Sequence, residues 1–192
     1  MMLTDGQKKC GVDMTDERDW FYCPPVKQKE TQCVEIIKQH LTKINEVSII
    51  GTRYPYNYVT ELHKEYNCKF NLIDFHPFFE EWCLEGLSFA DINIYRMRPL
   101  FDDINPIINK SDLIIFPETE YLLPFEYLNY DLKDKNVMFV NEEFEPNHIK
   151  NNFVYSLNDM EEMCNVKSNI KGKIIMPTNI MNNIFFYLLK LA

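Results

Sequence analysis

Short apolar runs alternate with amphipathic segments along most of the chain. Five runs have the length and continuity of buried strands: residues 47–51, 70–75, 92–95, 112–117 and 136–141. Strands that read as continuous apolar runs and are separated by helices indicate a parallel sheet covered on both faces. Because crossover connections between parallel strands are right-handed, the pattern predicts a doubly wound, mostly parallel α/β domain.

Apolar positions at helical spacing predict the elements between these strands. Helices are expected at residues 27–45, 58–67, 78–84, 102–109, 124–129 and 157–164. The third should end near Gly86, and the fourth should carry Asp102 and Asp103 at its positive end. Residues 172–176 and 184–191 fit a closing antiparallel pair, although the last segment also fits a helix because it contains good helix formers.

The first 26 residues are polar, lack periodicity and contain two consecutive prolines. We interpret residues 1–26 as an N-terminal arm with an aromatic anchor at Trp20, Phe21 and Tyr22. A single domain, residues 27–192, follows it and begins with a helical extension. The arm is expected to contact a partner or a second copy, so a homo-oligomer is expected through it.

Composition excludes several kinds of chemistry. The net charge of -9 and the pI near 5.0 disfavour duplex nucleic acid as a partner. None of the five glycines forms Gly-x-Gly, so the dinucleotide fingerprint is absent. The six cysteines include no Cys-x-x-Cys pair and no histidine at ligand spacing, so no metal site is expected. With no secretory core and no membrane-length apolar run, we expect a cytoplasmic protein without a membrane partner.

Residues directly after the strands are candidate ligand contacts, because open α/β sheets bind ligands outside the carboxyl ends of their strands. Gly51, followed by Thr52 and Arg53, either lets a ligand approach the backbone or forms a tight turn with positive φ. Asp74 ends the second strand about 23 residues later, close to the interval of nucleotide-binding units. It either accepts hydrogen bonds from ribose hydroxyls or caps the helix after Pro77.

Charged residues follow the third and fourth strands as well. Glu118 and Glu120, after Pro117, can bind an amine, act as a base or hold a metal, or they can be ordinary loop charges. Arg98 can hold an anionic substrate or a cofactor carboxylate, or can pair with the acids that begin the next helix. His76 lies at the edge of the second strand, but the sequence identifies no partner for it as a base.

The glycine after strand one, the aspartate ending strand two and the Asp-Leu-Ile-Ile-Phe-Pro-Glu edge at 112–118 form one pattern. It resembles the class I S-adenosylmethionine-dependent methyltransferases over roughly residues 47–191, which implies a Rossmann-like sheet. Residues 112–156 are similar to phage-encoded methyltransferase-like proteins, with Glu120 at the family's Glu position and Tyr121 replacing its His. The chain departs from the family's Glu-x-Gly-x-x-x-Gly loop, since Gly51 is followed by the bulky Arg53.

The resemblance implies S-adenosylmethionine as the cofactor. Asp74 would hold its ribose, Phe75 would stack near its adenine and Gly51 would face its backbone. Arg53 would fill space together with Tyr54, or would grip the cofactor carboxylate. The expected cofactor-binding residues are Gly51, Thr52, Arg53, Asp74, Phe75, Arg98 and Pro117. The expected catalytic residues, which would meet the substrate, are Glu118, Glu120 and Tyr121.

Three functions are compatible with this pattern. The first is methyl transfer to a small molecule or a protein, which needs mainly proximity and in-line geometry rather than a dedicated base. The second is a catalytically inactive Rossmann-like binding or structural module of a phage, favoured by the missing glycines and by Arg53. The third is another nucleoside-handling enzyme, such as a lyase or hydrolase of the cofactor. Enzymatic activity therefore stays open, and a viral protein would act in the host cytoplasm.

Overall fold

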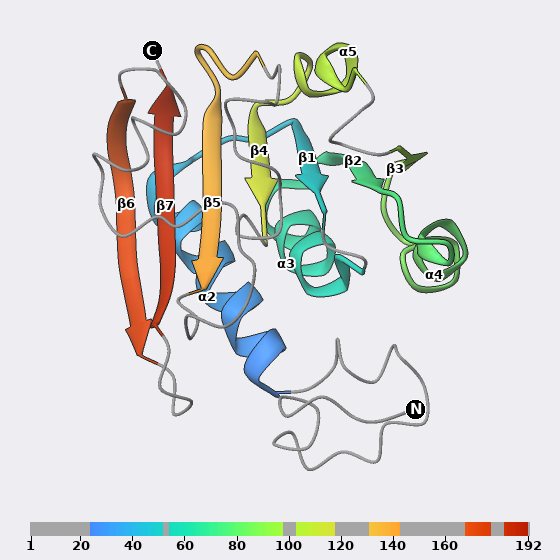
Figure 1. The fold of residues 1–192 in the computed structure, drawn as a ribbon, viewed down its shortest axis with the longest axis horizontal. Coiled ribbons are helices and arrows are strands. Elements are labelled where there is room, and N and C mark those ends of the chain that lie inside the picture. Colours follow the sequence, from blue (N-terminus) through green and yellow to red (C-terminus); the bar gives the residue numbers. More distant parts are fainter. Residues whose placement is uncertain are drawn as a thin grey trace, which may run out of the picture.

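A computed structural model describes residues 24–51, 54–97, 103–117, 131–142, 168–177 and 183–191. Its centre is a seven-stranded sheet in the order β3-β2-β1-β4-β5-β7-β6 (Figure 1). The strands are β1 (Glu46–Ile50), β2 (Lys69–Asp74), β3 (Ile92–Arg96), β4 (Leu113–Phe116), β5 (Asn136–Glu142), β6 (Ser168–Pro177) and β7 (Asn183–Leu191). The helices are α2 (Pro24–His40), α3 (Tyr56–Tyr66), α4 (Phe79–Gly86) and α5 (Asn105–Ile108).

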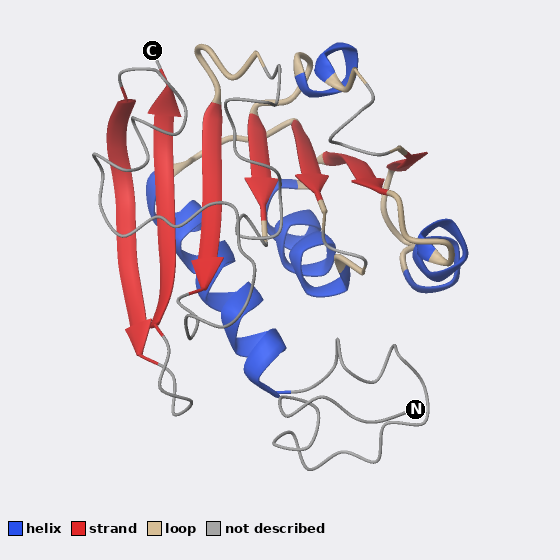
Figure 2. Ribbon diagram, viewed as in Figure 1, coloured by secondary structure: helices blue, strands red, loops and turns tan. Residues whose placement is uncertain are grey.

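Strand directions confirm the predicted doubly wound, mostly parallel sheet. Strands β1 to β5 are parallel to one another, and β7 lies antiparallel between β5 and β6 (Figure 2). The order reverses at β1, which pairs with β2 on one side and with β4 on the other. The closing antiparallel pair is also confirmed. The last segment is a strand because its apolar residues alternate between the two faces of the sheet rather than following a helical stripe.

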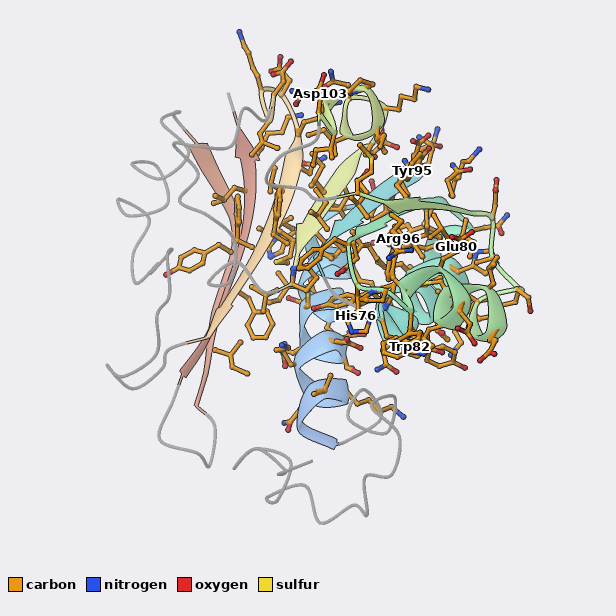
Figure 3. All side chains as sticks on the ribbon, turned by 45° about the vertical axis from the view of Figure 1, so that its right-hand side comes forward. His76, Glu80, Trp82, Tyr95, Arg96 and Asp103 are labelled. Atoms are coloured by element: carbon orange, nitrogen blue, oxygen red, sulfur yellow. The ribbon has the colours of Figure 1, made fainter. Side chains whose placement is uncertain are left out.

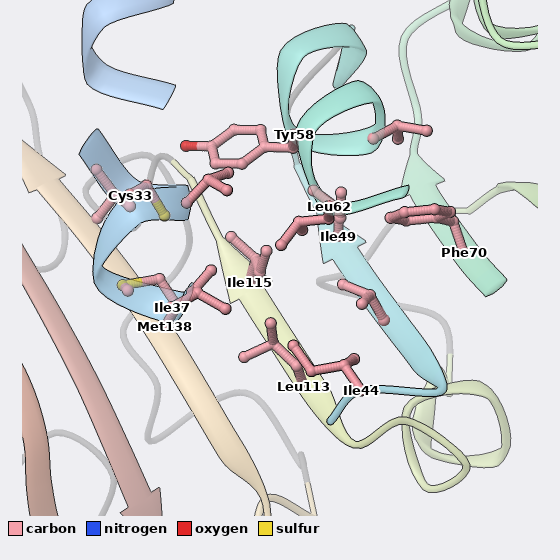
Figure 4. Close-up of a cluster of buried hydrophobic side chains, with 14 of the residues drawn as sticks. Cys33, Ile37, Ile44, Ile49, Tyr58, Leu62, Phe70, Leu113, Ile115 and Met138 are labelled. Atoms are coloured by element: carbon pink, nitrogen blue, oxygen red, sulfur yellow. The ribbon is translucent and has the colours of Figure 1, made fainter. Parts of the chain in front are cut away.

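Two separate apolar layers cover the sheet. One layer joins α2, α3 and α4 to alternate residues of the strands, including Ile49, Phe70 and Ile115 (Figure 4). The other packs Ile104 and Ile108, at α5, against residues such as Phe116 and Phe139, whose rings stack with centroids 5.2 Å apart. Burial on both faces is what the continuous apolar runs in the sequence require.

Polar groups near the amino-terminal ends of the strands form hydrogen bonds with one another. The Asp112 carboxylate accepts hydrogen bonds from the backbone N–H of Asn45 at 2.7 Å, from the Asn45 amide at 2.9 Å and from the Glu46 N–H at 3.3 Å. The buried hydroxyls of Ser48 and Ser111 lie 2.7 Å apart. These contacts fix β1 against the segment that enters β4.

A second polar chain crosses three strands at the same end of the sheet. The Asn71 amide donates to the Glu46 carboxylate at 2.6 Å, and the Asn93 amide donates to the Asn71 side-chain oxygen at 2.9 Å. These two hydrogen bonds can form in only one register of β1, β2 and β3. They therefore fix how the three strands align.

Element boundaries differ from the expectations at several points. Helix α2 ends at His40 rather than at residue 45, although Leu41 and Ile44 in the connection remain buried in the core. Helix α5 has only four residues, with a proline in its first turn, and the Asp103 carboxylate accepts the Asn105 N–H at 3.1 Å. Helix α2 starts inside the segment assigned to the arm, where prolines suit a first turn. The aromatic anchor and the helices expected at 124–129 and 157–164 lie outside the described residues.

Candidate functional site

The carboxyl ends of β1 and β2 place Gly51 and Asp74 side by side. Ile50 pairs with Ile73, and the ladder continues as the Gly51 N–H donates to the Ile73 carbonyl at 2.9 Å. Gly51 has a φ of 76°, in the left-handed region that favours glycine, so the turn expected of it is confirmed. Since β1 is where the strand order reverses, this pair lies at the edge where open α/β sheets bind ligands.

Asp74 is held in place by its own loop. Its side chain is 4% exposed, and its Oδ1 accepts the backbone N–H of His76 at 2.8 Å. It does not cap α4, because that helix begins after Phe78 without a side-chain cap, so the capping alternative is wrong. Burial, together with the nearby charge of Asp74, raises the pKa of the Cys83 thiol to about 12. The hydrogen bond from His76 therefore ties the buried carboxylate to the loop that follows β2.

Aromatic rings surround the loop that follows Asp74. Phe75 is 61% exposed, which leaves its ring available to a flat ligand. His76 stacks on Trp82 of α4 with ring centroids 4.9 Å apart (Figure 3). Phe78 stacks on the same indole with ring centroids 5.8 Å apart. The Phe78 N–H also donates to His76 Nδ1 at 3.4 Å. These contacts assign His76 a packing role in the loop.

Tyr54 leaves the β1 loop toward α4. It is buried, and its ring stacks on Tyr56 at 5.8 Å. A Cβ at Gly86 would overlap the Tyr54 hydroxyl, so Gly86 permits a close approach between this loop and α4. From the sequence, Gly86 was expected only to end a helix, because its contact with Tyr54 joins residues more than thirty positions apart.

Several predicted site residues lie outside the described part of the chain: Thr52, Arg53, Arg98, Glu118, Glu120 and Tyr121. Pro117, directly after β4, is described and buried. The structure thus brings together Gly51, Asp74 and Phe75. Pro117 lies at the end of β4, the strand that pairs with β1. The roles predicted for the residues outside this part remain predictions.

Two residues at this edge were not found from the sequence. Arg96, the last residue of β3, is exposed and pairs in register with Asp74 (Figure 3). The third strand was expected to end at residue 95, so Arg96 was not recognised as a residue of this edge. Trp82 was counted only as part of a helix, although an aromatic residue four positions after Phe78 was a signal for stacking.

No group of acids, histidines or cysteines that could hold a metal occurs in the described residues. The helices described are also too short or too polar to cross a membrane.

Comparisons with known proteins find similarity in structure and none in sequence. No protein-family model matches the sequence, and no curated protein matches it. N-methyltransferase NodS from Bradyrhizobium japonicum WM9, crystallised with S-adenosyl-l-homocysteine, matches with a TM-score of 0.63 and 11% identity over 95% of this chain and 97% of that chain. The S-adenosylmethionine-dependent methyltransferase SibL matches at 0.57 and 10% identity, over 94% and 61% of the two chains.

M. capricolum TrmK, also in complex with S-adenosyl-homocysteine, matches with a TM-score of 0.56 and 13% identity over 83% of this chain and 67% of that chain. Similarity at this level of identity shows the fold. The chain has the Rossmann-like fold of the class I methyltransferases. This confirms the fold implied by the resemblance, whereas the similarity to phage-encoded proteins has no support from these comparisons.

Proposed function

We propose that this protein binds S-adenosylmethionine at the carboxyl edge of β1, β2 and β4 and transfers its methyl group to a small molecule or a protein. The proposal depends on one observation, the placement of Gly51 beside the buried Asp74 carboxylate at the reversal of strand order. Solved structures with this fold that hold S-adenosyl-l-homocysteine support the choice of cofactor.

The described residues fit an adenosine group. The Asp74 carboxylate accepts the His76 N–H at the carboxyl end of β2, and a carboxylate at this place in the fold is a suitable acceptor for the hydroxyls of a ribose diol. The exposed ring of Phe75 follows directly and can stack on a purine. At Gly51 the backbone carries no Cβ, which lets a ligand approach it closely.

Methyl transfer requires of this chain mainly that it hold the cofactor and the acceptor close together and aligned. When bound, the cofactor supplies an electrophilic methyl group. Asp74, fixed by its turn, and Phe75 orient the nucleoside, so that binding supplies the proximity and alignment on which the rate depends. We assign Thr52, Arg53, Arg98 and Pro117 to the remaining cofactor contacts. We assign the acceptor to Glu118, Glu120 and Tyr121, which follow β4, the strand next to β1.

Isothermal titration with S-adenosylmethionine and with S-adenosyl-l-homocysteine tests the proposal. We expect Asp74→Ala to abolish measurable binding, and Asp74→Asn to weaken it about tenfold because the amide keeps one acceptor oxygen but loses the charge. Asp91→Asn, at an exposed position at the amino end of β3, is the matched control and should bind normally. An absence of heat at millimolar ligand, with folded protein, would overturn the proposal and favour the catalytically inactive module.

We further propose a phage origin and a cytoplasmic place of action. The support is a composition rich in asparagine, isoleucine, lysine and tyrosine, which is typical of AT-rich coding sequences. The neighbourhood of the coding sequence tests this origin. Virion and replication genes on both sides are expected, and a setting of cellular housekeeping genes would contradict it.

A further inference from the structure

Exposed apolar side chains concentrate on α4 and its flanking loops. Among the described residues, the large apolar side chains that are exposed are Phe75 (61%), Phe78 (51%), Leu84 (57%) and Phe89 (47%). All four fall within fifteen consecutive residues. Single exposed apolar residues are ordinary, but four of them in one short segment indicate a binding surface.

The same segment carries only negative formal charge. Between Phe75 and Asp91 the sequence contains Glu80, Glu81 and Glu85 and no lysine or arginine. All three glutamates are exposed on α4. Within the described part of the chain, neither Glu80 nor Glu81 forms an ion pair, whereas Asp91 pairs with Lys69 at 3.8 Å.

Packing inside the protein accounts for part of this pattern, because Phe78 stacks on Trp82 and Phe89 meets Tyr56 edge to face, whereas Leu84 has no such ring partner among the described residues. The buried residues of α4 are Phe79, Trp82 and Cys83, of which Phe79 and Cys83 pack in the core on the sheet and Trp82 packs against the preceding loop. Leu84 lies on the outer side, three and four positions after Glu81 and Glu80. Glu81 and Glu85 are also four positions apart, so their carboxylates are neighbours on this side of the helix. The outer side of α4 therefore offers an apolar side chain between carboxylates.

We propose that the outer surface of α4, formed by Phe78, Glu80, Glu81, Leu84 and Glu85, docks a basic amphipathic segment of a protein partner. Lysine or arginine side chains of that segment would meet the glutamates, and its apolar side chains would cover Leu84 and Phe78. Charge complementarity selects this occupant. A second copy would bring the same three acids against themselves, and nucleic acid or an anionic membrane would be repelled.

The surface begins directly after the carboxyl end of β2, where Phe75 follows Asp74. A segment docked on α4 therefore lies next to the edge at which the cofactor is proposed to bind. Docking does not depend on that function, and its test measures binding without the cofactor.

Fluorescence anisotropy with a labelled eighteen-residue peptide of lysine and leucine at helical spacing tests the proposal. The peptide should bind the full chain, and raising the salt concentration should weaken binding. Glu81→Gln combined with Glu85→Gln should weaken it about tenfold, and Leu84→Ser about fivefold. Glu61→Gln combined with Glu65→Gln on α3 is the matched control, because Glu61, which is half-buried, and Glu65, which is exposed, have the same spacing but pair with Lys64 and Lys38.

Three results would overturn the inference. One is an absence of binding at millimolar peptide, with circular dichroism showing that the protein is folded. Another is equal weakening by the α3 control pair, or equal binding of a peptide with the same composition in scrambled order. The third is a dimer, seen by sedimentation, that Leu84→Ser dissociates, since this would assign the surface to a second copy. Loss of cofactor binding at Asp74→Ala, by contrast, would leave docking unchanged.

Discussion

The two ends of the same sheet use polar residues in opposite ways. At the amino end, Asp112 accepts hydrogen bonds from Asn45 and Glu46. The hydroxyls of Ser48 and Ser111 also bond to each other, and all these distances lie between 2.7 and 3.3 Å. At the carboxyl end, Asp74 accepts a backbone N–H from the loop that it begins, and its neighbour Phe75 is exposed. The first arrangement joins strands to each other, whereas the second fixes a loop at the edge where the fold receives ligands.

This difference shows that polarity and burial alone do not identify a site. Asp74 and Ser48 are both buried polar residues of strands, but Ser48 is bonded to a residue from another element and Asp74 to its own loop. Substitutions at the amino end should therefore change stability and leave binding intact. Those at the carboxyl end should change binding, with stability costs that come only from backbone strain or packing.

The largest stability effect is expected from Asp112→Ala. Removing three hydrogen bonds to one partly exposed carboxylate should lower the free energy of unfolding by about 2 kcal/mol. Urea unfolding measures this loss, and titration below the unfolding transition should show unchanged binding of S-adenosylmethionine. Asp131→Ala, at an exposed position, is the control. A comparable loss in the control would contradict the role assigned to the Asp112 hydrogen bonds.

Gly86→Ala should follow, with a loss of about 1 to 2 kcal/mol from overpacking, because the new Cβ overlaps the buried Tyr54 hydroxyl. Thermal unfolding compares it with Ser88→Ala, an exposed position two residues later. Adding Tyr54→Phe removes the overlapping oxygen and should recover part of the loss. No recovery in the double variant would show that the cost has another origin.

Gly51→Ala at the carboxyl end of the sheet is compared with a variant at the amino end that should lose a similar amount of stability. A φ of 76° should cost alanine about 1 kcal/mol, and displacement of the loop should weaken cofactor binding. Asn67→Ala is the matched variant, because Asn67 has a φ of 48° after α3, just before the amino end of β2. It should lose similar stability and bind normally. Equal binding by both variants would remove Gly51 from the ligand edge.

The smallest effect is a pH dependence at the amino end. Burial alone would raise the pKa of Asp112, but the hydrogen bonds from Asn45 and Glu46 outweigh it and hold the pKa below its ordinary value. The unfolded chain therefore binds a proton at higher pH than the folded chain, and this contribution to stability is lost as the pH falls below about 4. Urea unfolding between pH 3 and 6 should show a shallower decline for Asp112→Asn than for the unsubstituted protein. Equal slopes would contradict the assignment.

The sequence predicted most of the fold because the governing signals are local. Apolar runs located the strands, and the ends of those strands identified Gly51 and Asp74 as neighbours at one edge. The bonds from Glu46 through Asn71 to Asn93 were not predictable in this way, since they depend on how strands more than twenty residues apart align. The overlap of Gly86 with Tyr54 has the same cause, because it exists only after α4 packs near the β1 loop.

The position of β7 sets an order of events during synthesis. Residues 183–191 lie between β5 and β6 in the sheet, and β7 is the strand through which β6 joins the others. While the ribosome still covers these residues, β5 has an unpaired edge and β6 has no place in the sheet. Assembly of β5, β6 and β7 must therefore wait until residues 183–191 have emerged from the ribosome, and until then the open edge of β5 exposes this protein to mispairing.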